Sequence, residues 1–239
     1  MFKAILFDLD GTLIYFDPEE FIKTYLFAAG NFFSDLVPSP EQFAKDILES
    51  ILNIEIADKG ETTVEEDFFA DFCPKYYFID CKTIKERFEE FYRTKFDVVK
   101  HLVKPINGAA ELIQKIKREY PEIKIVLATN PVFPLIAIEK RMTWGGLKKE
   151  WFDLITHVEN FHYCKGNLKY WDEILKIINI KPEEALVVGN DAKRDLTAKK
   201  CGLKTFLVED TLENGDYITR EINPDFKGKL TDLEEILMK

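Results

Sequence analysis

Two carboxylates, one residue apart, follow a short apolar run near the start of the chain. The run "KAILF" at residues 3–7 is followed by Asp8 and Asp10, and then by Gly11 and Thr12. Two unpaired carboxylates at the end of a buried strand repel each other and lose solvation, so they do not stabilise a fold. Their spacing points to chemistry, because a carboxylate can attack phosphorus or bind a metal ion. The structural alternative is a plain Asx turn after the strand.

Other polar side chains follow the later apolar runs, each where a strand would end. They are Thr129 and Asn130 after "KIVLA", Asn190 and Asp191 after "ALVVG", Asp195 one helical turn later, and Lys165 before the helical run "NLKYWDEIL". In an open parallel sheet, ligands bind beyond the carboxyl ends of the strands. These side chains are therefore expected to meet Asp8 and Asp10 in one crevice.

Carboxylates, a hydroxyl, an amide and one ammonium in a single crevice suit phosphoryl transfer. A carboxylate can attack phosphorus and form an aspartyl-phosphate. Mg²⁺ takes oxygen ligands, with one or two carboxylates beside phosphate oxygens and water. The metal ion and Lys165 would neutralise the charge on the phosphoryl oxygens, and the Thr129 hydroxyl would hydrogen-bond to them.

The elements that must position these residues fall into two classes. From residue 104 onward apolar runs typical of strands alternate with helical periodicity, which predicts a doubly wound parallel sheet of the α/β class. Residues 17–103 show only helical periodicity, with start signals at Asp17, Ser39 and Thr63. We therefore expect a Rossmann-like core of residues 1–16 and 104–239 and an inserted all-helical domain of residues 17–103. A helix is also expected to follow Asn190-Asp191, and a loop or hairpin at 214–228.

The composition excludes several classes of partner. A formal net charge of −10 argues against nucleic acid and anionic membranes, and the chain has no run of eighteen apolar residues. Four scattered cysteines without a C-x-x-C pair predict reduced thiols in a cytoplasmic protein; they are Cys73, Cys81, Cys164 and Cys201. The expected partner is a small phosphorylated metabolite, and the sequence leaves monomer and homodimer open.

Three stretches match known motifs in order along the chain. "DLDGTL" at residues 8–13 resembles the first motif of the haloacid dehalogenase (HAD) superfamily, "LATN" the second, and "VVGNDAKRDLTAKKCG" the fourth. The resemblance covers most of the chain. It implies a Rossmann-like core, a hydrolytic activity, and a helical C1-type cap in the place of the insert, where a lid would exclude water and select the leaving group.

The resemblance also implies a role for each matched residue. Asp8 would be the nucleophile and a Mg²⁺ ligand. Asp10 would protonate the leaving alcohol and then activate water, and its backbone carbonyl would bind the metal ion. Thr129 would bind the phosphoryl group, and Asn130 would assist through its backbone.

The third motif of the family, a lysine in "KPxP", departs here to "CKGNLKYW". Lys165 and Lys169 compete for the role, and the spacing to the "VVG" strand favours Lys165. Lys169 would then lie in the first turn of the following helix and face solvent. The loss of both prolines leaves this loop more flexible.

The fourth motif departs as well, because many relatives have Gly-Asp where this chain has Gly-Asn-Asp. We favour Asp191 as a direct metal ligand. The alternative is that Asn190 is the ligand, while Asp191 and Asp195 bind waters or Lys165. For Asp195 the structural alternative is a charge on a helix surface.

The expected function is a Mg²⁺-dependent phosphatase acting on a small phosphomonoester through an aspartyl-phosphate. A phosphomutase uses the same four motifs and stays an alternative. Dehalogenation needs no second acid, so Asp10 argues against it, and no cap lysine identifies a phosphonatase. A phosphate-accepting receiver module would be shorter and would lack the insert. A non-catalytic relative is a further alternative, because the third and fourth motifs are altered.

Overall fold

A six-stranded parallel sheet forms the centre of the core. The computed structural model describes residues 2–237, and its sheet has the strand order β5-β4-β1-β6-β7-β8. The strands are β1 Ala4–Phe7, β4 Lys124–Leu127, β5 Leu154–Ile155, β6 Ala185–Gly189, β7 Lys204–Val208 and β8 Phe226–Gly228. All five pairings are parallel, and β1 lies between β4 and β6. The carboxyl end of β1 therefore opens at the middle of one sheet edge.

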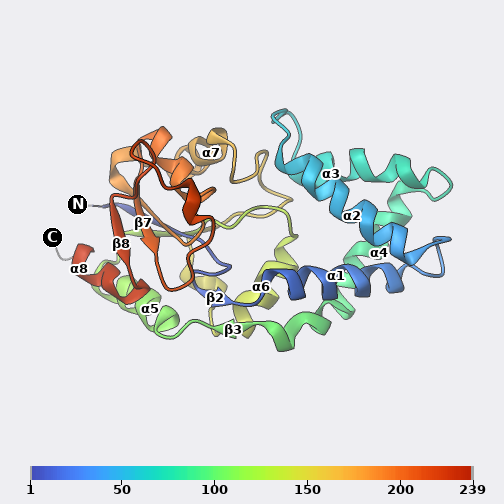
Figure 1. The fold of residues 1–239 in the computed structure, drawn as a ribbon, viewed down its shortest axis with the longest axis horizontal. Helices are drawn as coiled ribbons and strands as arrows, with labels where there is room; N and C mark the ends of the chain where they lie inside the picture. Colours follow the sequence, from blue (N-terminus) through green and yellow to red (C-terminus); the bar gives the residue numbers. More distant parts are fainter. Residues whose placement is uncertain (1, 238–239) are drawn as a thin grey trace.

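The side chains of β1 are all apolar and point alternately to the two faces of the sheet, which explains why helices cover both faces. Ile5 and Phe7 pack into one apolar cluster with α5 (Ala109–Glu119), and Ala4 and Leu6 pack into another with α7 (Leu168–Ile178). Successive side chains of a strand point to opposite faces, so a fully apolar strand needs a helix layer on each side. Figure 1 shows α5 and α7 on opposite sides of the sheet. The predicted doubly wound parallel core is confirmed.

Four helices are inserted after the first strand. They are α1 Pro18–Phe32, α2 Pro40–Glu55, α3 Val64–Phe72 and α4 Cys81–Thr94. Figure 1 shows them as a separate bundle beside the sheet, with α6 (Leu135–Trp144) between the bundle and the sheet. The chain enters and leaves the bundle through two short antiparallel strands, β2 Ile14–Tyr15 and β3 Lys104–Pro105. This agrees with the expected all-helical insert; the exact domain limits at 17 and 103 stay a prediction.

Local signals in the sequence determine where the inserted helices begin. The Asp17 carboxylate accepts a hydrogen bond from Glu20 N, and the Ser39 hydroxyl accepts one from Gln42 N. Thr63 begins α3 with a reciprocal capping box. Each cap satisfies a backbone N–H that the first turn of a helix leaves unpaired. Within the bundle, aromatic rings pack between helices, as in the stacked pair Phe33–Phe43 with ring centroids 4.3 Å apart.

Two expectations near the C-terminus are wrong in detail. The segment after Asp191 forms 3₁₀ turns at Asp195–Cys201 rather than an α-helix. The segment at 214–228, expected as a loop or hairpin, contributes the sixth strand β8, which pairs in parallel with β7. Three residues are too few to show a strand period in the sequence, so only the neighbouring strand defines β8. The chain then continues to the short helix α8 Leu233–Leu237. The periodicity of "TDLEEILMK" predicts a helix over 231–239, and its last two residues lie outside the described part of the chain.

The expectation of four reduced cysteines is wrong for one pair. Cys73 and Cys81 form a disulfide that closes the turn between α3 and α4, while Cys164 and Cys201 are free thiols. The spacing of eight residues between the two cysteines does not by itself indicate a disulfide, because the pairing depends on how α3 and α4 pack. In the described part of the chain, no helix is long and apolar enough to span a membrane.

We predict that the disulfide stabilises the helical insert. Replacing both Cys73 and Cys81 by serine should lower the free energy of unfolding by about 2 kcal/mol, because the unfolded chain gains the entropy of an open loop. Thermal and urea unfolding, each with and without dithiothreitol, measure this difference. The control Cys201→Ser should keep the full response to dithiothreitol; equal stability of the double variant and the wild type would contradict the prediction.

Candidate active site

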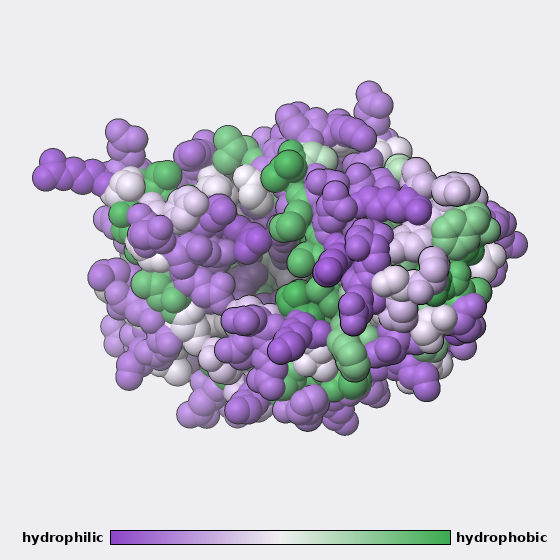
Figure 2. Space-filling model, turned by 45° about the vertical axis from the view of Figure 1, so that its right-hand side comes forward, coloured by the Kyte–Doolittle hydropathy of each residue, from purple (hydrophilic) through white to green (hydrophobic). Residues whose placement is uncertain are grey.

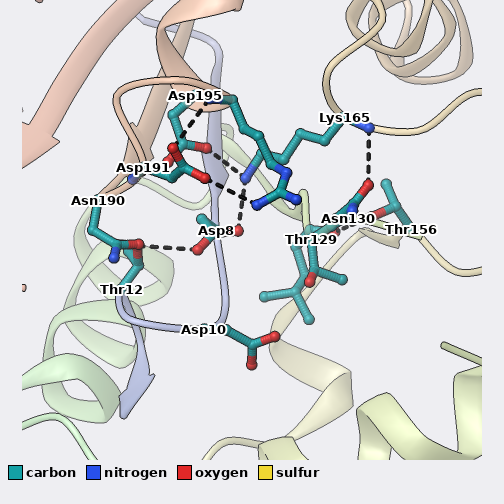
Figure 3. Close-up of polar contacts among 12 residues, drawn as sticks. Asp8, Asp10, Thr12, Thr129, Asn130, Thr156, Lys165, Asn190, Asp191 and Asp195 are labelled. Atoms are coloured by element: carbon teal, nitrogen blue, oxygen red, sulfur yellow. Dashed lines mark hydrogen bonds and ion pairs between the residues drawn. The ribbon is translucent and has the colours of Figure 1, made fainter. Parts of the chain in front are cut away.

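Asp8 lies at the centre of the carboxyl edge of the sheet. It directly follows β1, and its backbone N–H donates to Val188 O at 2.8 Å, which continues the pairing of β1 with β6. Its side chain is almost fully buried. Figure 3 shows Asp8 surrounded by polar side chains from several different segments. The convergence expected from the strand ends is therefore present around Asp8.

A buried ammonium lies between two buried carboxylates. Lys165 Nζ is 2.6 Å from Asp8 Oδ1 and 2.5 Å from Asp195 Oδ1, and the lysine is 2% exposed (Figure 3). Burial raises the pKa of Asp8 above its ordinary value, and the Lys165 ammonium opposes this shift only in part. Burial lowers the pKa of Lys165, but Asp195 and Asp8 outweigh it, so the lysine stays charged.

The second candidate lysine lies elsewhere. Lys169 is about half exposed, and its Nζ pairs with Asp58 of the insert at 2.8 Å. The structure thus brings Lys165, and not Lys169, to Asp8. Asp195 lies beside Lys165 and accepts a hydrogen bond from Asp191 N at 2.8 Å, so it is not a solvated charge on a helix surface.

The Asn190 side-chain oxygen faces Asp8. Thr12 Oγ1 lies 3.3 Å from Asp8 Oδ2 and 3.1 Å from Asn190 Oδ1, and donates to either (Figure 3). Asn190 Nδ2 donates to Thr211 O at 2.8 Å, which leaves the oxygen as the end of the amide that points inward. Gly11 has a φ of 83°, and a Cβ there would overlap the Asn190 side chain, so only glycine fits this turn.

The Asp191 side chain takes part in a different set of contacts. Its Oδ1 accepts hydrogen bonds from Lys193 N and from Asn214 Nδ2, both at 2.8 Å. Its Oδ2 pairs with Arg194 Nη1 at 3.1 Å. Both oxygens therefore have local partners, in contrast to the Asn190 oxygen, whose only hydrogen-bond donor among the described residues is the Thr12 hydroxyl next to Asp8.

Thr129 and Asn130 lie at the end of β4, on the other side of Asp8. The hydroxyls of Thr156 and Tyr170 donate to Thr129 O at 2.6 and 2.9 Å, which fixes the backbone at this point. Asn130 Oδ1 accepts from Lys165 N at 3.0 Å and so positions the lysine loop (Figure 3). This contact holds a loop that lacks the prolines of its relatives.

The insert reaches the site through one carboxylate. Glu55, the last residue of α2, accepts from Asn130 Nδ2 at 2.5 Å and from Arg194 Nη2 at 2.9 Å. The sequence did not single out Glu55 or Arg194. Glu55 belongs to no motif, and Arg194 lies in the fourth-motif stretch without an assigned role there. The two residues meet only because the end of α2 lies over the core.

Asp10 points away from Asp8 in Figure 3. Its Oδ2 lies 2.5 Å from Nη1 of Arg141, a residue of α6 that is 1% exposed. The sequence analysis missed Arg141. The sequence did contain a signal for it, because the helical period of α6 places Arg141 on the buried face of the helix. Ala137, Ile138 and Met142 are buried on the same helix.

The oxygen donors around Asp8 fit a magnesium ion. Among residues 2–237, no three His, Cys, Asp or Glu side chains are grouped closely enough to bind a metal ion. The donor set is of another kind: the Asp8 carboxylate, the Asn190 amide oxygen, and the backbone carbonyl of Asp10 on the same turn as Asp8. Mg²⁺ binds oxygen ligands, uses one or two carboxylates, and keeps several waters, which suits this set.

A cavity of about 460 Å³ lies between the insert and the core. Its wall combines aromatic side chains with unlike charges; it includes Tyr25, Phe68, Lys85, Tyr92, Val132 and Glu159. Figure 2 shows a hollow between the two parts of the molecule with hydrophobic side chains along it. A small molecule can therefore be enclosed by both parts, as is typical of ligand sites at domain interfaces.

Comparisons with known proteins agree with this architecture. A family model described as haloacid dehalogenase-like hydrolase matches residues 2–202. The chain is 26% identical to the pyrophosphatase PpaX of Bacillus cereus over 98% of this chain and 96% of that protein. Two similar crystal structures are a HAD phosphatase from Thermococcus onnurineus (TM-score 0.60, 21% identity, 98% and 97% coverage) and the magnesium-bound HAD-hydrolase YfnB of Bacillus subtilis (TM-score 0.57, 21% identity, 99% and 98% coverage). The chain belongs to the haloacid dehalogenase-like hydrolases and is an enzyme of this family, as its motifs predicted.

Proposed function

We propose that the protein is a Mg²⁺-dependent phosphatase that hydrolyses a small phosphomonoester through an aspartyl-phosphate on Asp8. The observation that carries the proposal is the buried Lys165 ammonium, which contacts both Asp8 and Asp195. A cation fixed beside a nucleophilic carboxylate is already in place to neutralise the negative charge of the phosphoryl oxygens when the substrate binds. A surface cluster of carboxylates would offer no such arrangement.

In the first step, an Asp8 oxygen attacks phosphorus, and the bond from phosphorus to the leaving oxygen breaks. Lys165 and Thr129 contact the phosphoryl oxygens and hold them in line with Asp8. Asp10 gives its proton to the leaving oxygen, so the alcohol departs neutral. The product of this step is the aspartyl-phosphate.

In the second step, Asp10 takes a proton from a water molecule, and the water oxygen attacks phosphorus. The bond between phosphorus and Asp8 breaks, which frees the Asp8 carboxylate and inorganic phosphate. One carboxyl group thus acts as acid and then as base, and the enzyme returns to its starting protonation state. The dehalogenase alternative leaves Asp10 without a role, and a phosphomutase is distinguished by the absence of released phosphate.

Asp8, the Asn190 amide oxygen and the Asp10 carbonyl would bind Mg²⁺, which would neutralise part of the charge on the phosphoryl group. We propose Asn190 rather than Asp191 as the ligand, because Asp191 is paired with Arg194 and two N–H donors. This reverses the preference drawn from the sequence, where a carboxylate ranks above an amide. The Thr12 hydroxyl lies within hydrogen-bond distance of both the Asn190 oxygen and Asp8, which supports the reversal.

We propose that the leaving group lies toward the insert, in the cavity that the aromatic residues line. The volume of about 460 Å³ suits a small metabolite. Inorganic pyrophosphate is part of the first substrate screen, because the similar Bacillus proteins carry the name pyrophosphatase.

We predict that hydrolysis of p-nitrophenyl phosphate requires Mg²⁺ and Asp8. EDTA or Asp8→Asn should abolish phosphate release, because the nucleophile or the charge compensation is lost. Asp10→Asn should lower kcat by about 10²–10⁴-fold on a substrate with a poor leaving group, the usual contribution of a general acid. Steady-state kinetics measure these effects, and near wild-type turnover of Asp8→Asn would exclude the proposed mechanism.

A second prediction separates the two lysines of the altered third motif. Lys165→Ala should lower kcat/KM by at least about 100-fold, since a preorganised charge beside the phosphoryl group is lost. The matched variant Lys169→Ala removes only a half-exposed ion pair with Asp58 and should change kcat/KM by less than about twofold. Similar losses in both variants would overturn the assignment of Lys165.

A third prediction concerns the metal ligands. Asn190→Ala should raise the Mg²⁺ concentration for half-maximal activity by about tenfold or more, while Asp191→Ala should leave it nearly unchanged. Isothermal titration of the same proteins with Mg²⁺ checks the binding without turnover. A larger shift in Asp191→Ala would return the ligand role to Asp191.

A further inference from the structure

Arg141 is the most unusual buried side chain near the site. It is 1% exposed, and its Nη1 lies 2.5 Å from Asp10 Oδ2. Within residues 2–237, Arg141 Nε and Nη2 are buried without a hydrogen-bond partner. An arginine kept for stability normally pairs most of its five donors, because unpaired buried donors cost free energy. The contact with Asp10 is therefore the one polar interaction that explains why Arg141 is buried here.

Two aromatic rings hold the guanidinium in place. Its centre lies 4.7 Å from the ring centroid of Phe133 and 5.9 Å from that of Phe21. Rings at these distances attract a cation and restrict its movement. Arg141 therefore contacts Asp10 from a fixed position, with Phe21 on the insert and Phe133 on the core.

The helix that carries Arg141 contacts both the insert and β2, the strand through which the chain enters the insert. Lys140 Nζ pairs with Asp97 at 2.6 Å and donates to Arg93 O at 3.0 Å, both at the end of the insert. At the C-terminal end of α6, Gly145 lies so close to Ile14 of β2 that a Cβ would overlap the Ile14 side chain. The helix is thus held against the strand that follows the Asp10 turn.

The two oxygens of Asp10 have different surroundings. Oδ2 accepts the hydrogen bond of Arg141, while Oδ1 is buried without a partner among the described residues. A carboxyl group with one oxygen fixed keeps only one oxygen for proton transfer. The hydrogen bond to Oδ2 then sets the direction in which Oδ1 points. An efficient general acid requires such a fixed orientation.

We propose that Arg141 is a positioning residue that orients the carboxyl group of Asp10 for proton transfer to the leaving group. The inference rests on the proposed function, in which Asp10 is the general acid. Arg141 does not contact the substrate in this assignment. It acts on the step in which the leaving oxygen departs, and it leaves substrate binding to other residues.

The test compares two substrates of similar size with different leaving groups. Phenolate leaves less readily than p-nitrophenolate, so hydrolysis of phenyl phosphate depends more on a general acid. Arg141→Met should lower kcat/KM, which reports only the steps up to departure of the leaving group, by about 100-fold for phenyl phosphate and by less than about tenfold for p-nitrophenyl phosphate. Arg141→Lys should recover part of the loss, because it restores a cation near Asp10.

Arg87 provides a matched control in the insert. Its guanidinium stacks on Phe32 at 4.3 Å and pairs with Asp35 and Glu90, all within the insert. Arg87→Met removes the same kind of arginine and should leave the ratio of the two kcat/KM values unchanged. Thermal unfolding of all variants reports how much stability each substitution costs.

The outcomes separate this inference from the proposed function. Asp10→Asn should show the same dependence on the leaving group, and adding Arg141→Met to it should cause little further loss. If Asp10→Asn shows no such dependence, the general-acid assignment fails and the inference fails with it. If Asp10→Asn shows it but Arg141→Met lowers kcat/KM for both substrates by the same factor, only the inference is overturned.

Discussion

The contact on which the site depends is the buried ion triad of Asp8, Lys165 and Asp195. Three charges out of water are tolerated only when they compensate one another, so each member fixes the other two. Lys165 reaches Asp8 at 2.6 Å and Asp195 at 2.5 Å, which joins the end of β1 and the 3₁₀ turns after β6 to the loop before α7. The same charges that make the site stable without substrate are those that would act on a phosphoryl group.

The insert makes polar contacts with core residues at the site, in addition to covering it. Glu55 binds Asn130 and Arg194, and the backbone of Val64 donates to Phe161 O at 2.8 Å. These contacts join the end of α2 and the start of α3 to the core next to the lysine loop. A movement of the insert would therefore break polar contacts at the site itself, which connects the enclosure of a substrate to the arrangement of the catalytic groups.

Much of the fold could be predicted because its signals are local. Apolar runs with polar ends predicted the parallel sheet, and caps such as Asp17 and Thr63 predicted the helix starts. The family's third motif, with its spacing to the "VVG" strand, favoured Lys165 over Lys169, and the structure brings Lys165 to Asp8. Short elements escaped prediction, because β8 has three residues and takes its conformation from β7. The Cys73–Cys81 disulfide escaped it for a related reason, since the pairing follows from the packing of α3 and α4.

The sequence by itself determined which residues stand at the strand ends, because strand periodicity and turn residues are properties of neighbouring positions. Tertiary structure alone decided which way those side chains point. Asn190 directs its oxygen to Asp8 because Thr211 accepts its amide hydrogen, and Asp191 is turned to Arg194. Arg141 reaches Asp10 from 131 residues away along the chain. Such contacts depend on the packing of distant segments, and no local pattern records them.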